Sequence, residues 1–322
     1  MATPAPATTS AQPKAAHPQY AFFRGRVVPI GEAQVSVMTH ALHYGTSVFA
    51  GIRGYWNNET GQLYVFRLKD HYRRFLQSCR LMMIDLPYSG DDLAHITLDL
   101  IRREGYEQDI YIRPLAYKSF EGIGVRLHNL PGDFTLFTIP FGKYIENEAG
   151  CHAMVSSFRR VDDNAIPARG KIGGAYVNSA LAKTEAEMAG FDEAIVLTED
   201  GHVSEGSASN LFIVRNGVAV TAPITDNILE GITRATLIQL LRDEMGIPVQ
   251  ERSIDHSELY VCDEAFFCGT GVQLSIITRI SHRPVGDGTP GPIASELRDR
   301  YFDVVRGANE KYLDWCFPVY TK

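Results

Sequence analysis

The sequence lacks an apolar run long enough to span a bilayer, and it has no excess of basic residues. Its 322 residues carry a formal net charge of -7 at pH 7, and the pI is about 5.8. These features favour neither a membrane nor a nucleic acid as the partner. The five cysteines form no C-x-x-C pair, so we expect neither a disulfide framework nor a zinc site. A cytoplasmic location, where thiols stay reduced, fits this pattern.

The N-terminal segment lacks both the apolar core of a secretion signal and the arginines of a transit peptide. It is rich in Ala, Pro and Thr, which predicts a disordered tail over residues 1–19. The whole chain is 45% hydrophobic and 21% charged, which is typical of a globular protein. Its length allows one large domain or two ordinary ones.

The first half of the chain mixes strand and helix patterns, which predicts an α/β (α+β) fold. A polar connector over 142–150 is the best candidate for a domain boundary. We therefore expect a small α/β domain at 20–145 and a larger domain at 146–322. The predicted elements of the first domain are strands at 21–30, 63–68, 109–119 and 134–140, with helices at 69–83 and 91–104.

The second half of the chain also contains both strand patterns and helix patterns. The helix expected at 175–190 places Val177, Leu181 and Met188 on one apolar face, which predicts that this face is buried. Asp200-Gly201 and Asn216-Gly217 have the chemistry of type I′ hairpin turns. The other expected elements are strands at 151–161, 248–252, 264–268 and 276–280, hairpins at 193–206 and 210–222, and helices at 232–246 and 291–308.

The segment "RGKIGGAYVNSA" places Lys171 beside glycines, yet it lacks the rest of a phosphate-binding P-loop. That motif needs a glycine where this chain has Ala165 and a Ser or Thr where it has Ile172. A metal site is equally unsupported, because His40 and His43 form an H-x-x-H pair with no evident third ligand. Lys171 therefore needs another explanation.

Three further segments suggest a ligand, although each has a commoner structural explanation when taken alone. Glu205 follows a predicted hairpin strand, where a surface turn glutamate is usual. Thr233 lies at the start of a helix, which is either an anion site or an ordinary cap. A Gly-Thr-Gly turn at 269–271 ends a strand. Pyridoxal 5′-phosphate (PLP) needs a reactive lysine, an acid at its ring nitrogen and a phosphate site, and so unites these signals.

The chain resembles the class IV aminotransferases, the fold-type IV PLP enzymes, and above all their branched-chain amino acid branch. The resemblance runs from about residue 20 to about residue 315. It rests on the motifs "MTHALHYGTSVFAGIRGY" (38–55), "YIRPL" (111–115), "KIGGAYVNSALAKTEA" (171–186), "VSEGSASNLF" (203–212), "LEGITR" (229–234) and "FFCGTG" (266–271). It implies a two-layer α/β N-terminal domain, a C-terminal pseudo-barrel domain that carries the PLP lysine, and a homodimer or higher homo-oligomer.

The resemblance also implies the roles of individual residues. Lys171 would be the Schiff-base lysine of a ping-pong reaction between an amino donor and a keto acid. Glu205 would keep the pyridine nitrogen protonated, and Tyr176 would bind the phenolic oxygen. The phosphate would be held by Arg74, the Ile232 N–H, Thr233 and Thr270, with Leu229 against the ring.

The expected substrate pocket is aromatic. It comprises Phe49, Tyr111, Phe141, Tyr144 and Gly271. The resemblance further implies that the neighbouring chain completes the pocket with Tyr44 and Val125. Arg113 either orients a carboxylate or plays a structural part, and the sequence leaves both open.

The chain departs from the branched-chain pattern at three places. Ala50 replaces an acid, Glu230 replaces a proline, and Gly271–Gln273 replaces "AAE". Ala50 and Gly271 are expected near the substrate, where they suggest a more permissive pocket. These departures leave open a transaminase that also accepts (R)-amines or D-amino acids. Two other classes also remain as alternatives: a PLP lyase like the aminodeoxychorismate lyases, which share the fold, and a non-catalytic PLP-binding protein.

Overall fold

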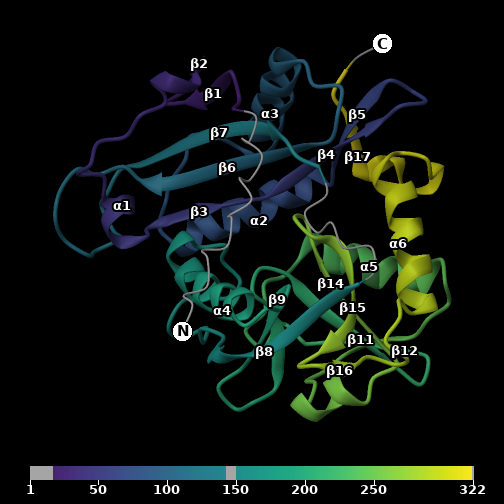
Figure 1. Cartoon of the computed structure of the whole chain (residues 1–322). Helices are drawn as coiled ribbons and strands as arrows, with labels where there is room; N and C mark the ends of the chain where they lie inside the picture. The colour runs from purple at the N-terminus through teal and green to yellow at the C-terminus, as the bar shows by residue number, and fades with distance from the viewer. Residues whose placement is uncertain (1–16, 143–149, 321–322) are drawn as a thin grey trace, which may run out of the picture.

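The structure is a computed structural model that describes residues 17–142 and 150–320. Residues 1–16 of the expected tail, the boundary between 145 and 146, and Tyr144 lie outside the described residues. Two β-sheets carry the fold, and helices pack on both (Figure 1). No helix in the described ranges is long and apolar enough to cross a membrane.

The first sheet is antiparallel throughout, in the order β17-β5-β4-β6-β7-β1-β2, with β3 beside β6. Its strands are β1 (Tyr20–Phe23), β2 (Arg26–Pro29), β3 (Ser47–Phe49), β4 (Ile52–Asn57), β5 (Gln62–Phe66), β6 (Ile110–Lys118), β7 (Gly132–Pro140) and β17 (Cys316–Pro318). The last of these is unexpected from the sequence, and it brings the chain's end back to the first sheet.

Helices α2 (Leu68–Leu81) and α3 (Gly90–Glu104) cover this first sheet, while α1 (His40–Tyr44) is a short helix that precedes β3. Ile52, Phe75 and Leu100, one each from β4, α2 and α3, belong to a single buried core. Helix α3 begins with a capping box at Ser89 and ends at Gly105, whose left-handed backbone closes the last turn. Helices were expected at 69–83 and 91–104, and the structure confirms both.

The second sheet is mixed, because β8 runs parallel to both β9 and β15, and β13 runs parallel to β12. Ile195, Ile213, Phe267 and Ile277 come from four of its strands and share one buried cluster, since the sheet curls into a half-barrel. The predicted pseudo-barrel is thus confirmed. The strands are β8 (Cys151–Arg159), β9 (Glu193–Leu197), β10 (Val203–Gly206), β11 (Asn210–Arg215), β12 (Val218–Thr221), β13 (Val249–Glu251), β14 (Glu264–Gly269), β15 (Gln273–Ile280) and β16 (Arg283–Pro284).

Helices α5 (Ile232–Asp243) and α6 (Pro292–Val305) pack on the outside of this second sheet. Figure 1 shows both on the same side, with α4 (Tyr176–Met188) against β8 and β9. The predicted turn at Asn216-Gly217 is confirmed, since both residues have positive φ. The type I′ prediction at Asp200-Gly201 is wrong, because only the glycine has positive φ and the loop spans residues 198–202.

The apolar face predicted for α4 is also wrong. Val177, Leu181 and Met188 are 65%, 46% and 86% exposed. The helix instead buries Ala182 and Ala186 against β8 and β9. Small side chains let the helix lie close to the sheet, so its large apolar residues are left facing outward.

Candidate active site

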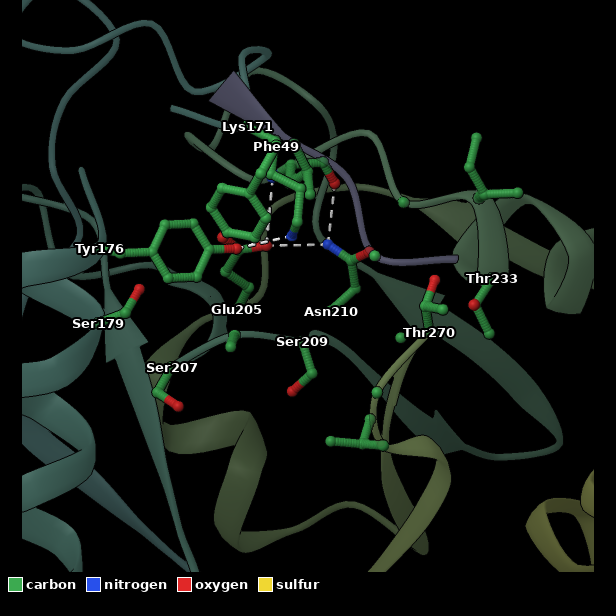
Figure 2. Close-up of a pocket in the computed structure, with 18 of the residues that line it drawn as sticks. Phe49, Lys171, Tyr176, Ser179, Glu205, Ser207, Ser209, Asn210, Thr233 and Thr270 are labelled. Carbon is green, nitrogen blue, oxygen red and sulfur yellow. Dashed lines mark hydrogen bonds between the residues drawn. The ribbon is translucent and has the colours of Figure 1, made fainter. Parts of the chain in front are cut away.

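A cavity of about 510 Å³ is lined by residues from both sheets (Figure 2). Phe49 and Tyr111 come from strands of the first sheet, and Glu205 and Asn210 come from strands of the second. The structure thus brings together residues that are far apart in the sequence. The predicted site residues that line this cavity are Phe49, Arg74, Tyr111, Arg113, Lys171, Tyr176, Glu205, Leu229, Ile232, Thr233, Thr270 and Gly271.

The backbone of Lys171 is tied to the first sheet. Its carbonyl accepts a hydrogen bond from the Phe49 N–H at 3.0 Å, and Ile172 forms a bridge with Val48. Its own N–H donates to the Ser78 hydroxyl of α2 at 3.1 Å. The lysine therefore sits on a segment that is fixed from two directions.

Glycines allow this close approach. A Cβ atom on Gly173 would lie 2.3 Å from the Ser47 hydroxyl oxygen, and one on Gly45 would lie 2.7 Å from the Cα of Gly174. The Gly174 N–H donates to the Gly45 carbonyl at 3.0 Å. Neither Gly173 nor Gly174 has positive φ, so a left-handed backbone is not the reason for glycine at these positions. The two glycines instead allow the close contact between the two backbones.

The Lys171 amine points into the cavity beside two aromatic rings. Its Nζ donates a hydrogen bond to the Tyr176 hydroxyl oxygen at 2.6 Å and lies 5.1 Å from the centre of the Phe49 ring. Burial, followed by the positive charge of Arg74, lowers the pKa of Lys171 to about 8. A lysine with this pKa has a substantial neutral fraction near physiological pH, which makes it a nucleophile and a base.

Glu205 is buried at the wall of the same cavity, and its two carboxylate oxygens have different neighbours. Oε2 accepts hydrogen bonds from Asn210 Nδ2 at 2.9 Å and from the Leu229 N–H at 3.2 Å. Oε1 lies 3.0 Å from a guanidinium nitrogen of Arg160. Burial raises the pKa of Glu205, and Arg160 is the strongest influence that acts against it. Figure 2 shows Lys171, Tyr176 and Glu205 converging on one space.

An anion cradle lies at the start of α5. The helix begins at Ile232 with Gly231 as its N-cap and no side-chain cap among the described residues, so first-turn N–H groups can receive an anion. Arg74 approaches from α2 and donates to the Glu230 carbonyl at 2.8 Å. Burial lowers the pKa of Arg74 to about 10, which leaves it cationic at neutral pH. Thr233 and Thr270 add hydroxyl groups to the same wall.

The opposite wall is aromatic. Phe49 packs on Tyr176 with ring centres 4.7 Å apart, and Tyr111 packs on Phe141 at 5.1 Å. Arg113 donates to the Tyr111 hydroxyl oxygen at 2.9 Å and lies over the Phe49 ring. Its Nε is buried without a hydrogen-bond acceptor in the described part of the chain. Such a wall suits an apolar side chain, and the arginine can still bind a carboxylate.

One of the two expectations about departures near the substrate is corrected, namely the one for Ala50. Ala50 is only 1% exposed and belongs to the core of the first sheet, so the loss of an acid there does not widen the cavity. Gly271 does line the cavity, but a Cβ atom there would meet no described atom within 4 Å and its φ is not positive. The turn therefore does not require glycine.

Tyr44 and Val125 do not line this cavity. The Tyr44 hydroxyl oxygen accepts a hydrogen bond from the Gly124 N–H at 3.2 Å, and Val125 is 77% exposed. The structure thus places the two predicted neighbouring-chain residues close together on one surface of the protein.

Among the residues that sequence reasoning missed, Asn210, Arg160 and Gly51 line the cavity, and Ser78 holds the backbone of Lys171. Asn210 lies five residues after Glu205, and that spacing across a tight turn could have suggested it as a partner of the acid. Arg160 carries no such signal, because the sequence does not distinguish it from the exposed Arg159 beside it.

Comparisons with known proteins agree with this geometry. The family described as Amino-transferase class IV matches residues 47–280. A probable branched-chain-amino-acid aminotransferase of Aquifex aeolicus is 46% identical over 94% of this chain and 97% of its own length. The branched-chain-amino-acid aminotransferase of Escherichia coli K12 is 38% identical over 93% and 97%.

Solved structures show the same likeness. The branched-chain aminotransferase of Thermoproteus uzoniensis, solved with norvaline, has a TM-score of 0.90 at 43% identity, over 94% of this chain and 100% of that chain. The branched-chain amino acid aminotransferase of Thermobaculum terrenum, solved in its PLP form, has a TM-score of 0.90 at 39% identity, over 94% and 99%.

Proposed function

The chain belongs to the class IV aminotransferases, and we propose that it transfers the amino group of a branched-chain or other apolar amino acid to a keto acid, with PLP as its cofactor. One observation carries the proposal. A lysine amine, a buried acid and an anion cradle with an arginine line the same cavity, which is the donor set that PLP requires.

The residues fit the cofactor at each of its functional groups. Lys171 would hold it covalently, and Tyr176 would bind the phenolic oxygen from its place beside the lysine. Arg74, Thr233, Thr270 and the first N–H groups of α5 would hold the phosphate dianion, with Leu229 against the ring. Glu205 would receive the ring nitrogen's N–H, which requires a carboxylate at that position.

When bound, the cofactor supplies an aldehyde that takes up the amino group and a ring that withdraws electrons from the substrate's α-carbon. Lys171 Nζ takes the proton from that carbon, because its pKa of about 8 suits a base near neutral pH. The Tyr176 hydroxyl holds this nitrogen in place. The same nitrogen would deliver that proton to the carbon that had been the cofactor's aldehyde carbon, and the second keto acid would reverse both steps, so that one residue serves both directions of the ping-pong cycle.

Amino acids fit the cavity better than amines without a carboxylate. Arg113 has a buried Nε without an acceptor in the described residues, which suits a carboxylate. The aromatic wall of Phe49, Tyr111 and Phe141 suits an apolar side chain. Ala50 lies in the core and leaves no extra room for (R)-amines. The bare Gly271 turn still permits D-amino acids, so they belong in the substrate panel.

We also infer a homodimer in which a second copy completes the pocket with Tyr44 and Val125. An exposed apolar patch supports this inference, and it surrounds the contact between Tyr44 and Gly124. Its most exposed members are Val37, Leu42, Ile123 and Val125. Residues 20–145 and 146–322 are the proposed domains, with PLP between them. All five cysteines are buried and none is paired in a disulfide, which suits a cytoplasmic location.

The proposal is tested with purified protein and a panel of donors. Leucine, valine, glutamate, D-alanine and (R)-1-phenylethylamine are each paired with 2-oxoglutarate and with pyruvate. We expect leucine and valine to give the highest kcat/KM. Borohydride reduction followed by peptide mapping should place the cofactor on Lys171. Fixation on another lysine contradicts the assignment, and a preference for the amine contradicts the substrate class.

A further inference from the structure

Arg160 and Glu205 form a buried ion pair at the cavity wall, 3.0 Å apart, with side chains only 12% and 6% exposed. We propose that Arg160 is a positioning residue that keeps the Glu205 carboxylate charged and oriented toward the cofactor's ring nitrogen. This inference rests on the role proposed above for Glu205. It assigns to Arg160, which has no expected contact with substrate, a part in the electron withdrawal that the reaction needs.

The position of the Arg160 side chain is fixed along its length. Its backbone N–H donates to the Leu197 carbonyl of β9 at 2.8 Å, and its Nε donates to the Asn227 carbonyl at 3.0 Å. The fork of the guanidinium can therefore direct a second nitrogen at Glu205 without rotating freely. Asn227 itself is held by Asp162 and by the Asp163 N–H.

The neighbours of Glu205 are donors, which favours the ionised form of the acid. Arg160 cannot accept a hydrogen bond, and the same holds for Asn210 Nδ2 and the Leu229 N–H. A carboxylate offers about four lone-pair sites, and these three donors use three of them. One site remains for the ring N–H. A neutral carboxyl group would instead have to direct its own proton at one of the donors or into the cavity.

Other charges around Glu205 cannot replace Arg160. Burial favours the neutral acid and raises the pKa of Glu205, while Arg160, Lys171 and Arg234 lower it, Arg160 most strongly. Arg234 is already paired with Glu251 at 2.9 Å, and Lys171 donates to Tyr176. Arg74 and the Tyr176 hydroxyl group also interact with the charge of Glu205, each from across the cavity.

Loss of Arg160 should therefore move the shared proton from the ring nitrogen to Glu205. The cation stabilises the nearby carboxylate more than it repels the more distant pyridinium, so the pair of charges depends on it. The holoenzyme is reconstituted with PLP labelled with ¹⁵N at the ring nitrogen, and solid-state NMR near neutral pH reports whether that nitrogen is protonated. This measurement is independent of turnover.

We expect the pyridinium signal in the wild type and a shift toward neutral pyridine in Arg160→Gln. The kcat of the same variant should fall about 10- to 100-fold, because that ratio corresponds to the free energy of one charge-assisted hydrogen bond. The change in KM should be smaller. Arg160→Lys keeps the charge and should recover most of the signal. Arg159→Gln removes the same charge from the exposed neighbour on β8 and should behave as wild type.

The outcomes separate this inference from the proposed function. If Glu205→Gln shifts the signal while Arg160→Gln keeps both the pyridinium signal and the wild-type kcat, Arg160 has no positioning role. If Glu205→Gln also keeps the signal, the role proposed for Glu205 is wrong, and this inference fails with it. If Arg160→Gln does not fold, Arg160→Met takes its place, because methionine keeps the apolar stem of the side chain while removing its charge. The same two measurements then decide whether Arg160 has a positioning role.

Discussion

A methyl group on Gly51 would lie 2.2 Å from the hydroxyl oxygen of Tyr111. Both residues line the cavity, and Gly51 lies between β3 and β4. The absence of a side chain at Gly51 therefore makes room for the tyrosine hydroxyl, which in turn accepts a hydrogen bond from Arg113. The position of Arg113, the candidate carboxylate ligand, thus depends on a glycine.

Gly51→Ala should displace the Tyr111 ring and lower kcat/KM for leucine. We expect a loss of about 100-fold, since a displacement of about 1 Å in a catalytic site can cost that much. Gly271→Ala is the matched control, because its new methyl group would meet no described atom within 4 Å. Steady-state kinetics decide the matter, with thermal unfolding as a check on the fold. An unchanged kcat/KM in Gly51→Ala would show that Tyr111 does not need this space.

The reaction of apo enzyme with PLP should depend on pH through Lys171. The neutral amine is the nucleophile, and the pKa of Lys171 is lowered to about 8 by burial and by Arg74. The rate constant for PLP incorporation should therefore rise about tenfold per pH unit below that value and level off above it. Stopped-flow absorbance measures this rate. A rise that continued to pH values near the ordinary lysine pKa would contradict the lowered pKa.

Arg74→Met should weaken PLP binding but not the binding of pyridoxal, which lacks the phosphate. The loss of a charge-assisted contact to the phosphate should raise the Kd for PLP about 10- to 100-fold. Arg73→Met is the control, because Arg73 is 70% exposed and pairs with Asp70. Fluorescence titration of apo enzyme with both ligands gives the comparison. Equal losses for PLP and pyridoxal would mean that Arg74 acts on the fold and not on the phosphate.

Val125→Glu should weaken the inferred dimer. A buried, unpaired carboxylate at an apolar interface is unfavourable, and the dimer dissociation constant should rise at least about tenfold. Val261→Glu is the control, since Val261 is 62% exposed and is not part of the patch around Tyr44. Analytical ultracentrifugation measures both variants. The surface is not an interface if the two variants sediment like the wild type.

Motifs with several chemical constraints were easy to predict from the sequence. Lys171, Glu205 and Thr233 lie in segments whose glycines and helix start limit what the chain can do there, and all three line one cavity. Residues that act by donating to another side chain were not predictable. Arg160 and Arg159 are adjacent and chemically identical, and only the register of β8 against β9 decides which one faces Glu205.

Helix α4 shows a second limit. Its sequence contains two faces with helical spacing, one of large apolar residues and one of small residues. Apolar size favours the face of Val177, Leu181 and Met188, yet the structure buries Ala182 and Ala186. The distance at which the helix packs on the sheet decides which face is buried, and that distance is a property of the tertiary fold. Strand β17 was missed for the same reason, because it forms only by pairing with β5.

The attachment of Lys171 to the first sheet has a consequence for stability. Phe49 and Val48 hold the lysine segment from one sheet, while Glu205 and the start of α5 belong to the other. A ligand bound by both sheets favours only conformations in which both are folded. Bound cofactor therefore couples the thermal unfolding of the two sheets. A substitution that destabilises either sheet should be detected first as release of the cofactor.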